Sequence, residues 1–291
     1  MLWIPLTLAA AFVQNLRSML QKRLTGALSV NGAAYVRFCY ALPFAWLYLL
    51  ALAAGDRLPR ISGAFGTFVV TGALAQILGT ACLLSAFTLR SFAVSTALSK
   101  TEAVQTALIG LLLLGDVVSP LAALGIGVSL AGVLLLTGSV PLQAALTNRR
   151  AVILGLLAGT GFALAAVGYR GAALSLPTGD APIRAGLTLA AALTIQTLVM
   201  GVYLGFRESG QLRRVAAAWR PGLWVGICGA AASAGWFTAM TLQTSALVRA
   251  LGQVELLFAV LASWWVFGER IRPRELIGMA VLVAGVCLLL G

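Results

Sequence analysis

The sequence predicts an all-α membrane protein of ten transmembrane helices, arranged as two inverted five-helix repeats around a central cavity. Two observations lead to this prediction. The 291-residue chain is 60% hydrophobic and 10% charged, with a mean hydropathy of +0.99. One water-soluble core cannot bury that much apolar surface, so lipid must be the solvent. The chain also repeats itself, because residues 86–138 align without a gap on residues 239–291.

The least common residues identify this repeat. Glu102 aligns with Glu255, at an offset of 153 residues. Each Glu is followed 13 residues later by a turn in which Gly precedes an acidic residue, with Pro soon after. Chance matches between abundant Ala and Leu residues do not produce this combination. The two turns are Gly115-Asp116 and Gly268-Glu269.

Hydrophobic stretches between polar or Gly/Pro turns predict ten spans. Each is close to the roughly 20 residues with which a helix crosses about 30 Å of hydrocarbon. They lack the alternation of barrel strands and are about twice as long. The first repeat, residues 1–147, contains the predicted spans 3–21, 32–54, 64–88, 92–114 and 120–139. The second repeat, residues 148–291, contains the predicted spans 150–174, 182–205, 221–242, 246–268 and 273–290.

An odd number of spans in each repeat determines how the repeats are related. The first repeat ends on the side opposite to its start, so the second repeat enters the membrane inverted. Two inverted halves can exchange conformations and expose one central site to each side in turn. This plan is typical of secondary transporters.

Basic residues are unevenly distributed over the loops. Loops after odd-numbered spans carry twelve of the twenty Lys and Arg residues, and loops after even-numbered spans carry three. The positive-inside rule therefore predicts cytoplasmic odd-numbered loops and both termini on the other side of the membrane.

Glu102 and Glu255 are the acidic residues predicted to lie at membrane depth, since the other six lie in loops. A charge near the bilayer centre costs at least about 2.5–3.5 kcal/mol, so it usually faces the bundle interior or a wet cavity. Lys100 and Arg249 precede the two glutamates in the same spans. Two roles are open. The carboxylates bind substrate or exchange a proton, or they are structural and pair with a base such as Lys100, Arg37 or Arg249. Amino acids carry both of the charges that such residues attract.

Uncharged polar and aromatic residues at mid-span are candidates for lining a pathway, although hydrogen bonding between helices is an alternative role for each. They are Gln14, Asn15, Tyr40, Gln76, Thr80, Tyr169, Gln196, Ser233, Trp236 and Gln253. The residues selected for substrate binding or coupling are Glu102, Glu255, Lys100, Arg249, Gln14, Gln76, Tyr169, Trp236 and Gln253. Arg17 and Arg170, also 153 residues apart, are expected to snorkel to the interface, with a substrate role as the alternative.

Several function classes are excluded by residues that the sequence lacks. Without histidine there is no imidazole proton relay, no His-ligated metal and no Ser-His-Asp triad. No phosphate-binding loop of an ATPase occurs. We therefore expect no cofactor, no metal and no enzyme activity; an intramembrane enzyme would need Glu102 and Glu255 to meet as a dyad. The net charge of +12 is assigned to loops that meet lipid headgroups, not to nucleic-acid binding.

Two equivalent segments carry a resemblance to a known family. TALSKTEAVQTALIGLLLLGD and RALGQVELLFAVLASWWVFGER resemble the EamA-type branch of the drug/metabolite transporter superfamily. The family commonly has Pro after the mid-span Glu, where this chain has Ala103 and Leu256. Within that branch the chain is similar to the YddG-type amino acid exporters. The resemblance implies a basket of ten helices around a central cavity, in a bacterial inner membrane, and export of aromatic or other neutral amino acids.

We therefore expect a monomeric secondary transporter that exports amino acids and related small metabolites by alternating access, with both termini in the periplasm. Its expected partners are a small-molecule substrate and membrane lipids. Two rivals share the fold. One is an exporter of drugs or lipophilic cations, and the other is a nucleotide-sugar or phosphate-ester exchanger that uses Arg37, Lys100 and Arg249.

Overall fold

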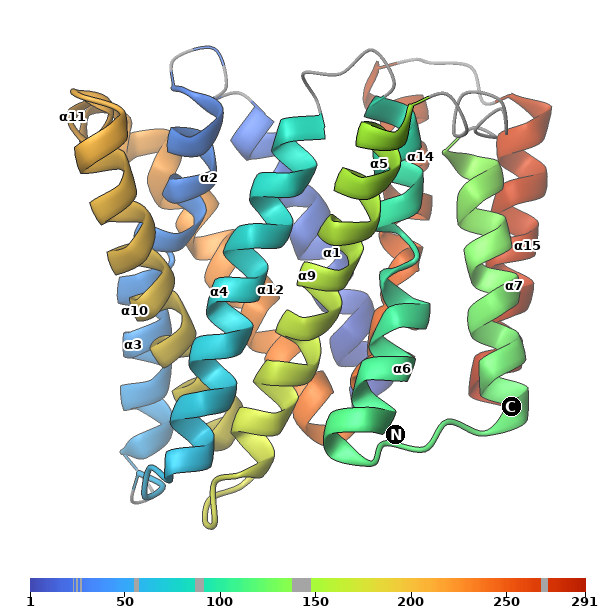
Figure 1. Cartoon of the computed structure of the whole chain (residues 1–291), viewed down its shortest axis with the longest axis horizontal. Helices are drawn as coiled ribbons and strands as arrows, with labels where there is room; N and C mark the ends of the chain where they lie inside the picture. The colour runs from blue at the N-terminus through green and yellow to red at the C-terminus, as the bar shows by residue number, and fades with distance from the viewer. Residues whose placement is uncertain are drawn as a thin grey trace. The chain divides into compact units, whose positions relative to one another are not determined.

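The computed structural model describes residues 1–291 except residues 23, 25, 27, 55–57, 87–91, 138–147 and 268–271, and the side chains of residues 22, 92–93 and 262–267. All secondary structure in this described part is helical (Figure 1), which confirms the predicted all-α class. Seven segments are long and apolar enough to cross a membrane by length and composition. The protein is thus a multi-pass membrane protein.

A helix falls on each of the ten predicted spans, although the number of membrane crossings stays a prediction. Residues 1–137 contain α1 (Trp3–Lys22), α2 (Val30–Cys39), α3 (Leu42–Ala53), α4 (Gly63–Ala86), α5 (Phe92–Ser99), α6 (Glu102–Leu114) and α7 (Pro120–Leu136). Residues 148–291 contain α9 (Arg149–Leu174), α10 (Ala181–Arg207), α11 (Gln211–Ala217), α12 (Trp219–Leu242), α13 (Ser245–Leu251), the 3-10 turn η1 (Gly252–Val254), α14 (Glu255–Phe267) and α15 (Pro273–Leu290).

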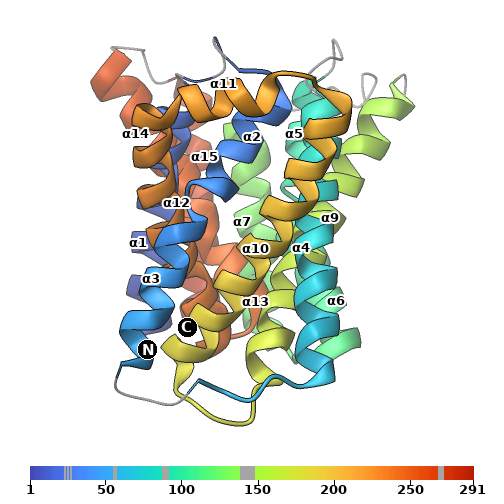
Figure 2. The same ribbon diagram turned by 90° about the vertical axis from the view of Figure 1, so that its left-hand side faces the viewer.

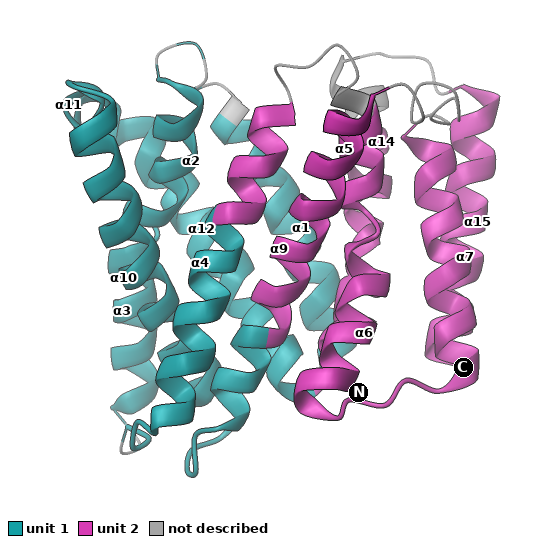
Figure 3. Ribbon diagram, viewed as in Figure 1, with its two compact units in different colours: residues 1–77, 168–242 teal, residues 78–167, 243–291 magenta. Residues whose placement is uncertain are grey.

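The chain folds into two compact units, each built from both halves of the sequence (Figure 3). Unit 1 comprises residues 1–77 and 168–242, and unit 2 comprises residues 78–167 and 243–291. These units are not the predicted repeats 1–147 and 148–291, because helices of one half bury their faces against helices of the other half. The homology of the two repeats stays a prediction from sequence.

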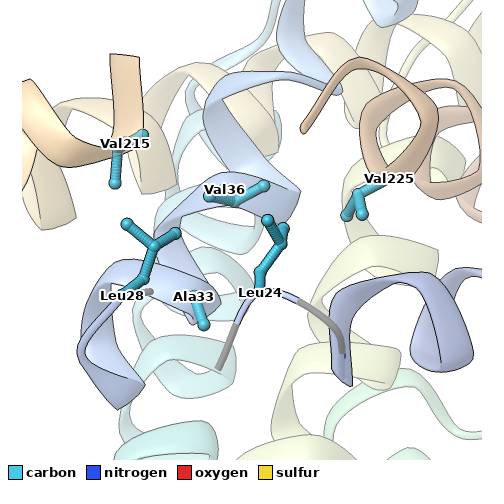
Figure 4. Packing of buried hydrophobic residues seen from close by; sticks show 6 residues of the cluster. All are labelled: Leu24, Leu28, Ala33, Val36, Val215 and Val225. Atoms are coloured by element: carbon cyan, nitrogen blue, oxygen red, sulfur yellow. The ribbon is translucent and has the colours of Figure 1, made fainter. Parts of the chain in front are cut away.

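In unit 1, α1 packs along α12, and α10 packs against α2, α3 and α12. The short helix α11 lies across the ends of α2 and α10 (Figure 2). A cluster of buried side chains joins the chain after α1 to α2, α11 and α12 (Figure 4). Its members are Leu24, Leu28, Ala33, Val36, Val215 and Val225.

Side-chain caps determine where α2 and α10 begin. Ser29 accepts a hydrogen bond from the Gly32 amide, and Asp180 accepts one from the Ile183 amide at 3.1 Å. Such caps satisfy amide groups that have no partner inside the helix. At the other end of α10, the Glu208 carboxylate accepts hydrogen bonds from Ser29 and from the Asn31 amide, which ties α2 to α10.

In unit 2, α7 and α15 pack closely through four glycines, Gly125 and Gly132 in α7 and Gly278 and Gly285 in α15. A Cβ on Gly125 would lie 2.6 Å from the Leu289 nitrogen, and one on Gly278 would lie 2.8 Å from the Leu136 nitrogen. The contacts run in opposite order along the two helices, so α7 and α15 are antiparallel. The glycines of each equivalent pair are 153 residues apart. This local packing is what inverted repeats require, and the inversion of the whole repeats stays a prediction.

Two of the predicted spans are broken at equivalent places. The first break lies at Lys100-Thr101 between α5 and α6, and the second is η1 between α13 and α14. At the first break, the amides of Lys100 and Thr101 bond back three residues, which tightens the turn. The breaks form although Ala103 and Leu256 replace the proline of the family pattern.

The predicted turn at Gly115-Asp116 ends α6. Gly115 has φ of 69°, a left-handed conformation that glycine adopts without the steric cost of a Cβ. Ser119 then caps α7, and Pro120 occupies its first position. The equivalent turn at Gly268-Glu269 lies outside the described residues.

Candidate functional site

Four of the predicted site residues form two ion pairs within unit 2, where α6 packs against α13. The Lys100 ammonium donates to the Glu255 carboxylate, with 2.8 Å between Nζ and Oε1. The Arg249 guanidinium pairs with the Glu102 carboxylate. Each pair joins a residue of the first half of the sequence to a residue of the second half. We call these two pairs the crossed ion pairs.

The helix breaks place both carboxylates at favourable positions. Glu102 is the first residue of α6, and Glu255 is the first residue of α14. The partial positive charge of a helix N-terminus stabilises a carboxylate there, beyond the ion pair itself. The Glu102 side chain is 6% exposed, whereas that of Glu255 is 24% exposed. The pair of Glu102 and Arg249 is therefore the more deeply buried one.

The four charges neutralise one another. The bases Lys100 and Arg249, expected to attract a substrate carboxylate, are bonded to Glu102 and Glu255, expected to attract an ammonium group. This arrangement favours the structural role that the sequence left open. A direct role in binding or coupling requires the pairs to open. Since each carboxylate has its own cation, the geometry also disfavours a proton shared between Glu102 and Glu255, which an intramembrane enzyme would need.

Neutral polar side chains surround the break in unit 2. Gln253, which occupies the position equivalent to Lys100, is 6% exposed, and its Oε1 atom has no hydrogen-bond partner among the described residues. Gln105 was not selected from the sequence. It donates to the Thr101 hydroxyl at 2.8 Å and accepts from the Thr160 hydroxyl at 2.6 Å, which links the break to α9. The sequence contains one indication of Gln105, because it is a single amide side chain three residues after Glu102 in an apolar stretch.

Unit 1 contains a hydrogen-bonded network of three side chains from α4, α9 and α10. The Tyr169 hydroxyl donates to the Gln76 Oε1 atom at 2.8 Å. The Gln196 amide donates to the same Oε1 atom at 2.6 Å and to the Tyr169 oxygen at 2.9 Å. The Tyr169 ring stacks on Phe237 with 4.4 Å between ring centroids. The structure thus brings together two predicted residues, Gln76 and Tyr169, and adds Gln196, which was a mid-span candidate.

The remaining selected residues, Gln14 and Trp236, also lie in unit 1. The indole nitrogen of Trp236 donates to the Gln14 Oε1 atom at 3.1 Å, which joins α12 to α1. Trp236 is only 5% exposed, so this tryptophan faces the protein. A buried indole normally needs such an acceptor, and the pair therefore stabilises the packing of the two helices.

Arg17, Arg37 and Arg170 are three of the arginines in the helices of unit 1. Arg170 donates to the carbonyl oxygen of Met240 at 2.7 Å, in the last turn of α12. Carbonyl groups in the last turn of a helix have no partner inside the helix, and Arg170 supplies one. The negative end of the helix dipole also attracts a cation there. Arg170 therefore has a structural task. The aliphatic part of the Arg17 side chain lies against α12, because a Cβ built on Gly229 would be 3.5 Å from the Arg17 Cδ atom.

Arg37 is different, because it lies in the last turn of α2 and inside the candidate span Val30–Ala53. Its guanidinium lies 4.6 Å from the ring of its neighbour Phe38. Among the described residues no carboxylate pairs with it. A helix C-terminus stabilises a cation by about 0.3–1 kcal/mol. That is less than the roughly 2.5–3.5 kcal/mol that a charge at membrane depth costs.

Unit 2 also contains an apolar groove between α14 and α15. It suits hydrocarbon and not a polar solute, because its lining is almost wholly apolar. Its lining residues are Leu257, Leu261, Leu276, Met279, Ala280, Val283 and Ala284. In the described part of the chain, no group of three His, Cys, Asp or Glu side chains is placed to hold a metal ion.

Comparisons with known proteins agree with this architecture. One solved crystal structure matches with a TM-score of 0.74 and 16% sequence identity, covering 99% of this chain and 96% of the other. At this identity the likeness shows the fold alone. No curated protein sequence matches the chain significantly. The model of the EamA-like transporter family matches residues 1–138 and 149–291. Nearly the whole chain is covered, and the protein therefore belongs to the EamA-like transporter family.

Proposed function

We propose that the protein is a secondary transporter that exports amino acids, aromatic or other neutral ones, and related small metabolites across the bacterial inner membrane by alternating access. Membership of the EamA-like family makes it a membrane transporter of small solutes, and members of this family are transporters, not enzymes. The observation that carries the finer proposal is the pair of crossed ion pairs at the two helix breaks.

Broken helices at membrane depth have a known physical context. Irregular backbone is tolerated there only where it is buried in protein or lines a water-filled cavity. In transporters with inverted repeats, broken helices form the solute site, and one repeat rocks against the other. Here both ion pairs join the first repeat to the second, so a rocking motion would strain or open them. Because the cluster is neutral as a whole, closing it again leaves no buried charge without a partner.

Ten spans, inverted repeats and a single-chain pathway belong to the same proposal. The antiparallel packing of α7 against α15 supports inversion, since these helices are equivalent in the two repeats. The odd-numbered loops face the cytoplasm and both termini face the periplasm, as the distribution of basic residues predicts. The protein acts as a monomer, because two fused repeats complete one pathway.

Amino acids fit the charges of the site better than the rival solutes do. A lipophilic cation needs a carboxylate that is not already neutralised, and Glu102 and Glu255 are both paired with bases. A phosphate-ester exchanger needs a cluster of unpaired bases, and two of the three expected ones, Lys100 and Arg249, are neutralised. A zwitterion has no net charge, so its entry leaves the charge balance of the cluster unchanged.

Flux measurements in reconstituted vesicles test the proposal. Labelled aromatic or neutral amino acids should enter by counterflow, and excess unlabelled amino acid should compete with them. Lipophilic cations and phosphate esters should compete poorly. If amino acids give no flux above empty vesicles, or if cations compete better than amino acids, export of amino acids is wrong.

The role of the two carboxylates needs separate variants. If Glu102 or Glu255 carries a proton that drives transport, Glu102→Gln or Glu255→Gln should abolish uptake driven by a proton gradient and spare exchange. Glu275→Gln is the matched control, because Glu275 lies in the first turn of α15 and bonds the Arg272 amide at 2.8 Å. Full transport by both variants under every gradient would reject proton coupling through these residues and leave facilitated diffusion.

A further inference from the structure

The short helix α11 of unit 1 lies at the surface of the membrane. It connects α10 to α12, and both of these helices are candidate membrane spans. The chain therefore leaves the membrane before α11 and enters it again after α11. The helix runs across the ends of α2 and α10 and not along them (Figure 2). A helix in this position lies in the plane of the membrane interface.

One face of α11 is fixed to the helices beneath it. Gln211 and Val215 are buried, and Val215 belongs to the cluster that also contains Leu28 and Val36 (Figure 4). The Tyr40 hydroxyl, at the end of α2, donates to the Val215 carbonyl oxygen at 2.9 Å. Residues four apart lie on the same face of a helix. The opposite face of α11 is therefore held in a fixed position and points away from the bundle.

Positive charge is concentrated on α11 and on the helix ends next to it. Residues 207–220 contain four exposed arginines, which are Arg207, Arg213, Arg214 and Arg220. Glu208 is the only acidic residue in this range, and its carboxylate accepts hydrogen bonds from Ser29 and Asn31. In the part of the chain that the structure describes, no salt bridge neutralises the four arginines. Their combined field attracts an anionic partner.

Large aromatic side chains are exposed on both sides of α11. Phe206 at the end of α10 is 86% exposed, and Trp219 and Trp224 at the start of α12 are 54% and 61% exposed. The Arg220 guanidinium lies 5.4 Å from the centre of the Trp219 ring, so charge and aromatic surface are adjacent. A bilayer surface suits both, because aromatic rings settle at the headgroup level and arginines reach the phosphates. A soluble polyanion matches the arginines alone.

We infer that α11, with the adjoining ends of α10 and α12, is a binding surface for anionic phospholipid headgroups. The partner is a lipid and not the transported solute, so this inference goes beyond the proposed function. The excess of basic residues in odd-numbered loops predicts orientation only, whereas here one fixed helix presents arginines beside exposed aromatic rings. Because α11 contacts α2, α10 and α12, lipid bound to it stabilises the folded state of unit 1.

The first test uses the unmutated full chain in detergent and follows its thermal unfolding midpoint. Short-chain phosphatidylglycerol, short-chain phosphatidylcholine, inorganic phosphate and polyglutamate are added in separate titrations. Phosphatidylglycerol should raise the midpoint to saturation, with an apparent affinity at least about 10-fold higher than that of phosphatidylcholine. Salt at about 0.5 M should remove most of this difference. Equal shifts with phosphatidylcholine or with phosphate, a larger shift with polyglutamate, or a difference that salt does not reduce overturns the inference.

The second test uses double variants at Arg213 and Arg214, which are exposed on α11. An arginine near an anionic membrane surface contributes roughly fivefold to binding, so Arg213→Gln with Arg214→Gln should lower the affinity for phosphatidylglycerol about 25-fold. The affinity for phosphatidylcholine and the midpoint without lipid should not change. The double change to lysine keeps both charges and should keep the affinity.

The matched control is Arg149→Gln with Arg150→Gln, which removes an adjacent exposed pair of the same charge at the start of α9. A candidate span begins directly at Arg149, so no helix in the plane of the interface presents these side chains. The control should lower the affinity for phosphatidylglycerol by no more than about threefold. An unchanged affinity in the variant of α11, an equal loss in the control, or an equal loss in the lysine variant overturns the inference.

Discussion

Removal of the Glu102 carboxylate is the sharpest test of the crossed ion pairs. In Glu102→Gln the Arg249 guanidinium loses its carboxylate in a site where the Glu102 side chain is 6% exposed. Breaking a buried pair by removing one partner costs about 3–5 kcal/mol. Because the Arg249 side chain is 25% exposed, part of its charge stays solvated, and we expect a loss of about 3 kcal/mol in the free energy of unfolding.

The other pair provides the comparison. Lys100 and Glu255 are 21% and 24% exposed, so Glu255→Gln should cost only about 1 kcal/mol. Unfolding midpoints in detergent at neutral pH measure both variants. The double variant Glu102→Gln with Arg249→Met should be more stable than Glu102→Gln alone, because it leaves no uncompensated charge. Equal losses for the two glutamates, or a double variant whose loss is the sum of the single losses, would show that burial does not set the strength of these pairs.

Three further predictions concern packing and hydrogen bonds. Gly132→Ala should destabilise the protein by about 1–3 kcal/mol, because the new methyl group meets the backbone of α15 at Leu282; Gly127→Ala, with open space around it, should be neutral or stabilising in the same unfolding assay. Tyr169→Phe should cost about 1–3 kcal/mol, since the buried amide of Gln196 and the half-buried amide of Gln76 each lose a partner, and a thermal melt that shows no loss would contradict the network. Trp236→Phe should cost about 1–3 kcal/mol, because the Gln14 amide oxygen loses the indole donor. Unfolding midpoints measure this loss, and Trp224→Phe, at an exposed tryptophan of the same helix, is the control.

The helical class was predictable from the sequence for a simple reason. Lipid requires long apolar helices, so composition and segment length suffice to predict an all-α membrane protein. The offset of 153 residues marked Glu102 and Glu255 as equivalent before any geometry was known. Gln76, Tyr169 and Trp236 were selected because each is a polar or aromatic residue inside a predicted span.

The partners of these residues were decided by the tertiary structure alone. Lys100 stands two residues before Glu102 in the chain, yet it bonds Glu255, which is 155 residues away. Residues two apart on a helix do not face each other, so the nearest opposite charge in sequence is not the nearest in space. No proline in the sequence marks the break at Lys100-Thr101. Main-chain hydrogen bonds of Lys100 and Thr101 hold this turn instead.

The apolar composition and the internal repeat thus predicted the all-α membrane class and marked the charged residues whose burial costs free energy. Only the fold decided which of those costs are offset. Packing across the two halves neutralised the four charges of unit 2 and left Arg37 of unit 1 without a carboxylate among the described residues. Electrostatic pairing depends on distances between side chains of different helices, and these distances exist only once the helices have packed.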